Sequence, residues 1–127
     1  MDDAPPDPRR TAVQAEALYL VNLLLLPGIA FVLLLWLSRR HAASAHPLAR
    51  CHLRQTVRAS IGAGLLLIAV PAAVAAVADL DQPATWILLL LYFLCCHASL
   101  VLLGVLGLSR AIAGQLFVYP LFGKRAC

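Results

Sequence analysis

The chain has few charged side chains for its length. Of its 127 residues only 13% are Asp, Glu, Lys or Arg, whereas 62% are hydrophobic, and its mean hydropathy is +0.87. Soluble domains carry about 25% charged residues. Because so few polar side chains could not cover the surface of a soluble fold, the composition predicts an integral membrane protein.

The sequence also lacks the features of several other protein classes. It contains no internal repeat, no coiled-coil heptad and no second domain. Its basic residues flank apolar runs, so we expect contact with the anionic lipids of the cytoplasmic leaflet and not with nucleic acid. The four cysteines predict no disulfide framework, because Cys51 and Cys127 should face the reducing cytoplasm while Cys95 and Cys96 lie within lipid.

Carboxylates are absent from the apolar runs of the sequence. All six acidic residues lie outside these runs. An intramembrane protease needs a buried Asp pair or a Ser with a His base, and phosphoryl transfer needs a Gly-rich loop or metal-binding carboxylates. The sequence therefore predicts a protein that is not an enzyme and has no catalytic residue.

Three apolar runs are long enough to cross a membrane, at residues 17–37, 61–78 and 86–108. A helix needs roughly 20 residues to cross a hydrocarbon core of about 30 Å. We therefore expect an all-α integral membrane protein, a three-helix bundle formed by a single domain of residues 11–127. Residues 1–10 contain three prolines and no apolar period, so they are expected to be a disordered leader.

Charge alternates between the successive loops of this arrangement. All six acidic residues precede the first run or lie between the second and the third, whereas eight of the ten basic residues follow the first or the third run. Loops retained in the cytoplasm carry excess Lys and Arg. We therefore predict a multi-pass protein of the bacterial inner membrane with its N-terminus outside and its C-terminus inside. Arg9 and Arg10 break this pattern.

Proline and arginine modify two of the predicted helices. Pro27-Gly28 lies at the centre of the first run, where it predicts a kink that serves either packing or a gating hinge. The second helix is expected to begin at Pro47 as a basic amphipathic extension in the headgroup region, and to enter the membrane near residue 61. Its arginines lie at i, i+4 and i+8: Arg50, Arg54 and Arg58.

Small residues line one face of the second and of the third run. Such faces let helices approach closely, and in lipid this packing replaces the hydrophobic driving force. In the second run they are Gly62, Ala69, Ala73 and Ala76. In the third run they are Gly104, Gly107, Ala111 and Gly114. Residues 117–122 then form an apolar segment expected at the cytoplasmic interface, with Lys124 and Arg125 reaching the phosphates.

His97 lies at the centre of the third run, close to Cys95 and Cys96. A polar group at that depth is costly, so it indicates a function or a hydrogen bond within the bundle. Imidazole and thiolate bind copper and haem iron, but neighbouring side chains on a helix point about 100° apart and cannot converge alone. Three interpretations stay open: a structural hydrogen bond, a haem or metal site, and a proton relay.

A second group of histidine and cysteine side chains lies in the basic loop: His41, His46, Cys51 and His52. Their spacing matches no zinc-binding pattern, and the five arginines nearby would repel a cation. We expect these residues to pack at the membrane interface and to contact lipid.

Two short motifs flank the second and the third helix. The first is His46-Pro47-Leu48-Ala49-Arg50-Cys51-His52-Leu53-Arg54-Gln55, and the second is Arg110-Ala111, Gly114 and Tyr119-Pro120-Leu121. In these motifs the chain resembles a widespread family of small bacterial membrane proteins of unknown function, which are distantly similar to the Tic-twenty protein-import component of chloroplasts. The resemblance implies a compact helical bundle in which five residues meet at the cytoplasmic interface: His52, Gln55, Gly114, Tyr119 and Pro120. Gln115 stands where the family has an acidic residue, which leaves a charge pairing with Arg54 open.

The predicted topology brings the same two segments together. The start of the second helix and the tail after the third are both cytoplasmic, and an antiparallel pair would place them side by side. We therefore predict that Gln55 or His52 hydrogen-bonds backbone near Tyr119-Pro120. The complete set of expected interface and lipid residues is Arg50, His52, Arg54, Gln55, Arg58, Tyr119, Pro120, Lys124 and Arg125.

These features favour a non-enzymatic accessory or assembly subunit of the inner membrane, which acts by packing its helices against partner proteins. We expect it to bind no cofactor. A first alternative is a haem- or copper-handling membrane protein that uses His97 with Cys95 or Cys96. A second alternative, which rests on the resemblance alone, is an oligomeric channel or protein-translocation component.

Overall fold

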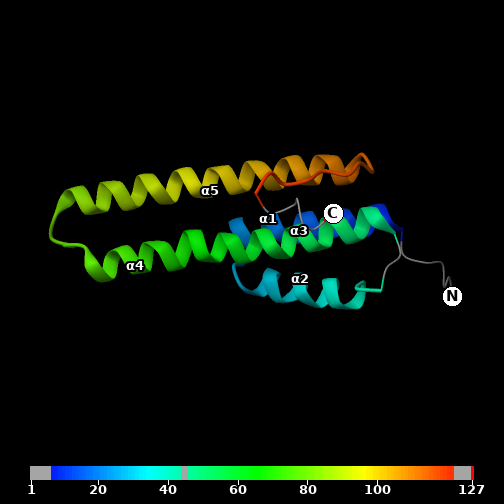
Figure 1. The fold of residues 1–127 in the computed structure, drawn as a ribbon, viewed down its shortest axis with the longest axis horizontal. Helices are drawn as coiled ribbons and strands as arrows, with labels where there is room; N and C mark the ends of the chain where they lie inside the picture. The colour runs from blue at the N-terminus through cyan, green and yellow to red at the C-terminus, as the bar shows by residue number, and fades with distance from the viewer. Residues whose placement is uncertain (1–6, 44–45, 122–126) are drawn as a thin grey trace.

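The computed structural model describes residues 7–43, 46–121 and 127, and among these it contains helices and no strand. The helices are α1 (Pro8–Leu24), α2 (Ile29–Arg40), α3 (Pro47–Gly64), the π-helical turn η1 (Leu65–Ala69), α4 (Val70–Val77) and α5 (Pro83–Ile112). Because α3, η1 and α4 follow one another without a break, they form one rod (Figure 1). The predicted all-α class is confirmed.

Local sequence explains where these helices begin. Three helices that follow a non-helical segment have proline in the first turn, where its missing N–H leaves no hydrogen bond unmade; these are α1, α3 and α5. The Asp7 side chain caps α1 by accepting a hydrogen bond from the Arg9 N–H at 3.0 Å. The prediction of a disordered leader over residues 1–10 is therefore wrong for residues 7–10, and residues 1–6 lie outside the described part of the chain.

The first apolar run forms a hairpin and not a single span. Helix α1 ends at Leu24, α2 begins at Ile29, and Figure 1 shows α2 returning along the bundle beside α1. Pro27 has no N–H to donate, and Gly28 adopts a φ of 88°, a left-handed conformation that glycine tolerates best. The Gly28 N–H is bound by the Asn22 Oδ1 atom at 3.0 Å. The kink predicted at Pro27-Gly28 is thus a complete reversal, and the predicted three-helix bundle is not what the structure shows.

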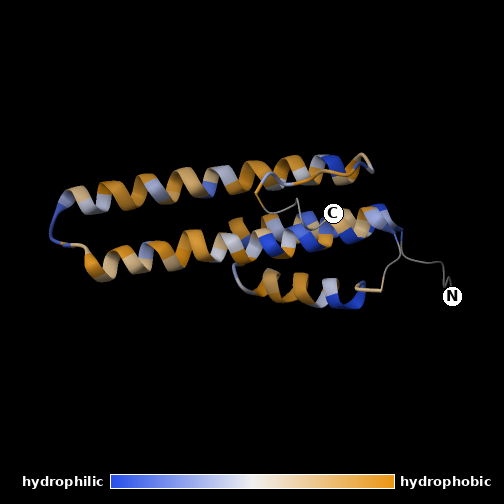
Figure 2. Cartoon of the chain, viewed as in Figure 1, coloured by the Kyte–Doolittle hydropathy of each residue, from blue (hydrophilic) through white to orange (hydrophobic). Residues whose placement is uncertain are grey.

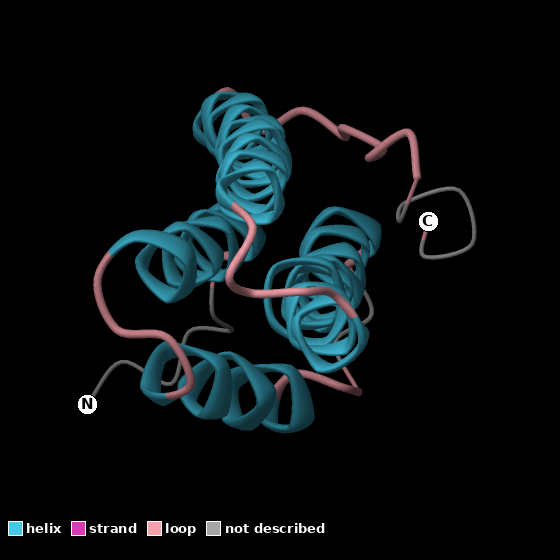
Figure 3. Cartoon of the chain, turned by 90° about the vertical axis from the view of Figure 1, so that its left-hand side faces the viewer, coloured by secondary structure: helices cyan, strands magenta, loops and turns pink. Residues whose placement is uncertain are grey.

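Two helical rods are long and apolar enough to cross a membrane: Pro47–Val77 with 31 residues and Pro83–Ile112 with 30. At about 1.5 Å per residue each measures roughly 45 Å, which exceeds a hydrocarbon core of about 30 Å. Helices α1 and α2 have only 17 and 12 residues, so they cover about half the length of the rods (Figure 1). Figure 3 shows the helices side by side when the bundle is viewed along its length. The length and composition of these rods support a membrane protein.

One end of the bundle carries the described basic residues. The starts of α1 and α3 and the ends of α2 and α5 lie at this end, opposite the α4–α5 turn (Figure 1), and Figure 2 shows hydrophilic residues gathered there. The arginines on these segments are Arg9, Arg10, Arg39, Arg40, Arg50, Arg54, Arg58 and Arg110. We call this the arginine-rich end. Asp79 and Asp81 lie in the turn at the other end, so Arg9 and Arg10 are no longer exceptions.

Helix α1 packs against α2, α3 and α5. Glycine on α5 permits its close approach, because a Cβ atom added to Gly104 would lie 2.6 Å from the Leu20 Cδ2 atom. Ala111 packs with Ala12 and Leu48 in the same interface. Three residues of the small-residue face predicted on the third run, Gly104, Gly107 and Ala111, are therefore covered within the chain, whereas Gly114 is exposed. The face predicted on the second run is not covered, because Ala69, Ala73 and Ala76 are exposed.

Pro71 explains the π-helical turn between α3 and α4. The Val70 N–H bonds the Leu65 carbonyl instead of the Leu66 carbonyl, and Pro71 has no N–H to offer in exchange. The Leu66 carbonyl accepts a hydrogen bond from the Tyr92 hydroxyl at 2.9 Å. A side chain of the neighbouring rod thus satisfies the backbone group that proline leaves free, as membrane helices require.

The hairpin turn yields a first prediction. Replacing Gly28 with Ala forces a β-carbon into a left-handed conformation, so we expect a loss of about 1–2 kcal/mol of stability. Gly64 is the matched control, because a Cβ atom at either glycine meets nothing within 4 Å but Gly64 has an ordinary helical φ. Gly64→Ala should leave stability unchanged or raise it. Thermal unfolding in detergent measures both; equal effects would contradict the reversal at Gly28.

Candidate functional site

A carboxyl group lies at the centre of the arginine-rich half of the bundle. Glu16 on α1 is 0% exposed, and so are its neighbours on the same helix face, Ala12, Ala15 and Tyr19. This face turns towards α3 and α5, where the chain offers small residues and hydrogen-bond donors. A carboxylate in such surroundings must be hydrogen-bonded or neutralised, because its desolvation is costly.

Three side chains from other segments surround the Glu16 carboxyl. The Tyr119 hydroxyl donates to Oε2 at 2.5 Å, and the Gln55 Nε2 atom donates to Oε1 at 3.0 Å. The His52 Nδ1 atom lies 2.5 Å from the same Oε1 atom. We call these four residues, Glu16, His52, Gln55 and Tyr119, the Glu16 cluster; all four are 0% exposed.

The second nitrogen of His52 defines how many protons the pair holds. His52 Nε2 lies 3.2 Å from the Gln115 carbonyl oxygen, and a carbonyl can only accept, so Nε2 carries a hydrogen. One further proton then lies between Nδ1 and Glu16. Whether it is assigned to the imidazole or to the carboxyl, the pair has no net charge. Such a pair can be buried without leaving an isolated ion in the protein interior.

Gln55 connects the cluster to the tail that follows α5. Its Oε1 atom accepts a hydrogen bond from the Tyr119 N–H at 3.3 Å, which turns its Nε2 atom towards Glu16. The predicted hydrogen bond from Gln55 or His52 to backbone near Tyr119-Pro120 is confirmed. Burial, with the Glu16 carboxyl nearby, raises the pKa of Tyr119, so its hydroxyl keeps the proton that it donates.

Glycine forms the wall of the cluster on α5. A Cβ atom added to Gly107 would lie 2.5 Å from the Glu16 Oε2 atom and 2.6 Å from the Tyr119 hydroxyl oxygen. The Tyr19 ring meets the Tyr119 ring edge to face, with centroids 6.0 Å apart, and the Tyr19 hydroxyl donates to the Leu100 carbonyl at 3.2 Å. The cluster is therefore closed on every side by protein.

The other residues predicted at the interface lie elsewhere. Arg50, Arg54 and Arg58 are exposed along one face of α3, and Pro120 is exposed. The Gln115 side chain accepts a hydrogen bond from Arg110 at 2.7 Å, so it pairs with that residue and not with Arg54. Lys124 and Arg125 lie outside the described residues. His52, Gln55 and Tyr119, which the sequence grouped with lipid-contacting residues, contact protein instead.

The histidines and cysteines of the basic loop form no common site. His41 bonds the Leu37 carbonyl through Nδ1 at 3.1 Å, and the His46 Nδ1 atom accepts from the Leu48 N–H at 3.3 Å. Cys51 is joined to Cys127 by a disulfide, with their Cα atoms 4.7 Å apart. The expectation of two free thiols was wrong in the structure, because the tail after α5 returns to α3.

His97 and its two neighbouring cysteines do not converge. The His97 ring lies against the Phe93 ring, nearly parallel, with centroids 5.6 Å apart, whereas Cys95 is exposed. Within the described part of the chain, no three His, Cys, Asp or Glu side chains are placed to share a metal ion. His97 lies ten residues from Gly107, about 15 Å along α5, so it does not continue the Glu16 cluster.

Glu16 is the site residue that sequence reasoning missed. The predicted topology placed all carboxylates outside the membrane and Glu16 across the bilayer from His52, yet the structure brings the two into contact. Since residues in contact cannot lie on opposite sides, the predicted outside N-terminus is incompatible with a cytoplasmic His52. The available signal was helical spacing, because apolar or small residues stand at Ala12, Ala15 and Tyr19 around Glu16.

Known proteins provide no assignment for this site, so its geometry is the basis for its interpretation. No family model matches the chain, and no curated protein and no solved structure matches it. The cluster itself is a closed hydrogen-bond network that joins α1, α3 and the tail after α5. Because its four side chains have no exposed surface, its hydrogen bonds are made within the protein and hold these three segments together.

The cluster yields a second prediction, for which the chain supplies a matched control. Tyr119→Phe leaves the buried Glu16 Oε2 atom without its donor and should lower stability by about 2–3 kcal/mol. Tyr19→Phe removes an equally buried hydroxyl that bonds only a backbone carbonyl, and should cost about 1 kcal/mol. Chemical unfolding in detergent measures both.

A double-mutant cycle makes this test specific to the carboxyl group. In the background of Glu16→Gln, the cost of Tyr119→Phe should fall, whereas that of Tyr19→Phe should stay nearly constant. Equal costs for the two tyrosine variants, or no coupling between Glu16 and Tyr119, would show that the carboxyl does not organise the cluster.

Proposed function

We propose that this is an inner-membrane protein with two spans and a re-entrant hairpin. The rods Pro47–Val77 and Pro83–Ile112 would cross the bilayer, and α1 and α2 would enter and leave from one side. The arginine-rich end would face the cytoplasm, because loops retained there carry excess Lys and Arg. Asp79 and Asp81 would lie outside, and both chain ends inside.

The hairpin tip is suited to lie within the membrane. Its turn contains Leu25 and Leu26, which are 72% and 50% exposed, so lipid would cover them. Non-helical backbone at membrane depth must be supported by protein. Here the Asn22 side chain binds the Gly28 N–H, and α1 packs along α3 and α5.

For this protein we propose the role of a non-enzymatic accessory or assembly subunit. The observation that carries the proposal is that one of two similar small-residue faces is buried within the chain and the other is exposed. On α5, Gly104, Gly107 and Ala111 are buried, whereas on the second rod Ala69, Ala73 and Ala76 are exposed. Small side chains favour close helix packing in lipid, so the exposed face fits a transmembrane helix of a partner protein.

The Glu16 cluster supports a structural and not a catalytic role. A general acid or base must come within hydrogen-bond reach of a substrate, and Glu16 and His52 are fully buried among protein groups. The resemblance to the Tic-twenty-like bacterial family is compatible with a subunit of a larger membrane assembly. Self-association through the same face would instead support the channel or translocation alternative.

The topology yields a third prediction. In a variant without the four natural cysteines, Arg9→Cys and Arg40→Cys should react with a membrane-impermeant maleimide from the cytoplasmic side. Asp81→Cys should react from the opposite side. Right-side-out and inside-out vesicles separate the two outcomes. Because a three-span arrangement would place Arg9 and Asp81 on the same side, labelling of both from one side would refute the re-entrant hairpin.

The natural cysteine pair provides an independent control of orientation. The structure joins Cys51 to Cys127, but glutathione and thioredoxin keep cytoplasmic thiols reduced. The proposed orientation therefore predicts that the two residues are free thiols when growing cells are quenched with acid and alkylated. Oxidant added to membranes should then join them, since the structure places them within bonding reach. A disulfide already present in quenched cells would place the arginine-rich end outside.

The partner surface yields a fourth prediction. A photo-crosslinking amino acid at Ala73 should form one adduct with a membrane protein of defined mass. At the adjacent Val74, which is also exposed but lies off the small-residue face, it should form none. Ala73→Leu should abolish co-purification of that protein, whereas Val74→Leu should preserve it, because only the first blocks close helix approach.

Each other result of this crosslinking experiment is decisive. Adducts with lipid alone at both positions would overturn the accessory-subunit proposal. An adduct of twice the mass of the chain would overturn the proposed foreign partner and support an oligomer of this protein.

A further inference from the structure

A cavity of about 590 Å³ opens where the α1–α2 hairpin ends. Eleven of its fourteen lining residues are apolar or glycine, and they come from both arms of the hairpin, from the first rod and from α5. Its size falls within the range of small-molecule sites, which are mostly apolar and carry a few polar groups. The other three residues are Asn22, Ser60 and His97.

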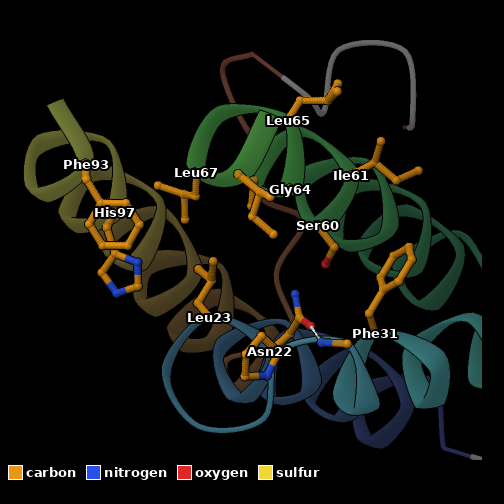
Figure 4. Close-up of a pocket in the computed structure, with 14 residues that line it drawn as sticks. Asn22, Leu23, Phe31, Ser60, Ile61, Gly64, Leu65, Leu67, Phe93 and His97 are labelled. Atoms are coloured by element: carbon orange, nitrogen blue, oxygen red, sulfur yellow. Dashed lines mark hydrogen bonds between the residues drawn. The ribbon is translucent and has the colours of Figure 1, made fainter. Parts of the chain in front are cut away.

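Ser60 supplies a buried hydroxyl without a partner. It is 5% exposed, and its Oγ atom has no hydrogen-bond partner among the described residues. A helical serine normally bonds the carbonyl one turn earlier, as Ser99 does with Cys95 at 2.8 Å. Ser60 does not, and Figure 4 shows its oxygen directed into the cavity. A polar group left in this state indicates a partner from outside the described part of the chain.

His97 and Asn22 approach the same space from two other helices. The His97 Nδ1 atom is buried and also lacks a partner among the described residues. The Asn22 Oδ1 atom is held by the Gly28 N–H at 3.0 Å, which turns the amide NH₂ group towards the cavity, as Figure 4 shows. Three helices therefore direct polar groups to one apolar chamber, and all three groups can donate hydrogen bonds.

The lining and shape of the cavity restrict the ligand. Ser60 and His97 lie near the midpoints of the rods Pro47–Val77 and Pro83–Ile112, and most of the lining around them is apolar, which disfavours a charged phospholipid headgroup. The Phe93 ring is nearly parallel to the His97 ring beside it, so Phe93 offers an aromatic face against which a planar ligand can stack. Exposed apolar side chains at the rim, among them Leu65 and Ile68, leave an exit for an alkyl tail into the bilayer.

We propose that this cavity binds a lipophilic quinone, a planar ring with carbonyl oxygens and an apolar tail. The carbonyl oxygens would accept hydrogen bonds from the Ser60 hydroxyl, the His97 imidazole and the Asn22 amide. The ring would stack against Phe93 with one carbonyl at the edge of the His97 imidazole, and the tail would leave past Leu65. The proposal concerns binding alone, and it is independent of the partner-packing role of the second rod.

The test uses the full-length protein in detergent and a benzoquinone with a ten-carbon alkyl chain. Binding is measured as a rise in the thermal unfolding midpoint with ligand concentration. Decylbenzene, which has the same chain and ring but no carbonyl, separates recognition of the quinone from filling by any apolar molecule. The quinone should bind at least tenfold more tightly than decylbenzene.

Variants of the residues that line the cavity test the proposed contacts with the ligand. Ser60→Ala should weaken quinone binding about five- to tenfold, yet leave the ligand-free midpoint unchanged or higher because it removes an unpaired polar atom. His97→Phe should weaken binding similarly while keeping a flat ring. Gly64→Leu should abolish binding by filling the space, since nothing lies within 4 Å of a Cβ atom there. Ser99→Ala, outside the cavity, should change nothing.

Two outcomes would overturn the proposal. Equal binding of decylbenzene and the quinone would show an acyl-chain groove without recognition of the carbonyls. Unaltered quinone binding by both Ser60→Ala and His97→Phe would show that the ligand does not use these groups. A folding defect is distinguishable from either result, because it would lower the ligand-free unfolding midpoint.

Discussion

The fold depends on the burial of one carboxyl group. An unpaired carboxylate inside a protein costs several kcal/mol, and Glu16 avoids this cost by facing His52, Gln55 and Tyr119. Two of these partners are engaged a second time: His52 with the Gln115 carbonyl and Gln55 with the Tyr119 N–H. Removing any one segment would therefore leave buried polar groups of the others unpaired. The tail after α5, which has no regular structure at these positions, owes its placement to this network.

The contact between Glu16 and His52 constrains how the first apolar run can be arranged. A single helix over residues 17–37 would separate its ends by about 30 Å, which would carry Glu16 far from the segment that follows Arg40. The reversal at Gly28 returns the chain to its starting level, so both ends of the run reach α3. This arrangement also gathers the described arginines at one end, as an electrostatic preference for one face of a membrane favours.

Several features could be predicted because they follow from local patterns. Helical periodicity and apolar length identified the helical class and the two long rods, and Pro47 identified the start of the first rod. The meeting of Gln55 with Tyr119 followed from antiparallel neighbours. The hairpin could not be predicted in this way, because hydropathy counts apolar residues and does not register a reversal. Glu16 was missed for the same reason: the assumed span placed it across the bilayer from His52. The unpaired Ser60 hydroxyl has no sequence signal, since it depends on what three helices leave unfilled.

The length of the hairpin explains both the cavity and the uncovered helix face. Helix α1 has 17 residues, about 26 Å, beside rods of roughly 45 Å, so α1 covers Gly104 and Gly107 but ends near the level of His97. Beyond its tip the two rods have no third helix of this chain against them, and Ala73 and Ala76 stay exposed. At the tip itself the turn is made by Pro27 and Gly28, which have too little side chain to fill the space between α3 and α5. The surface proposed for a protein partner and the chamber proposed for a quinone are therefore two consequences of the same short element.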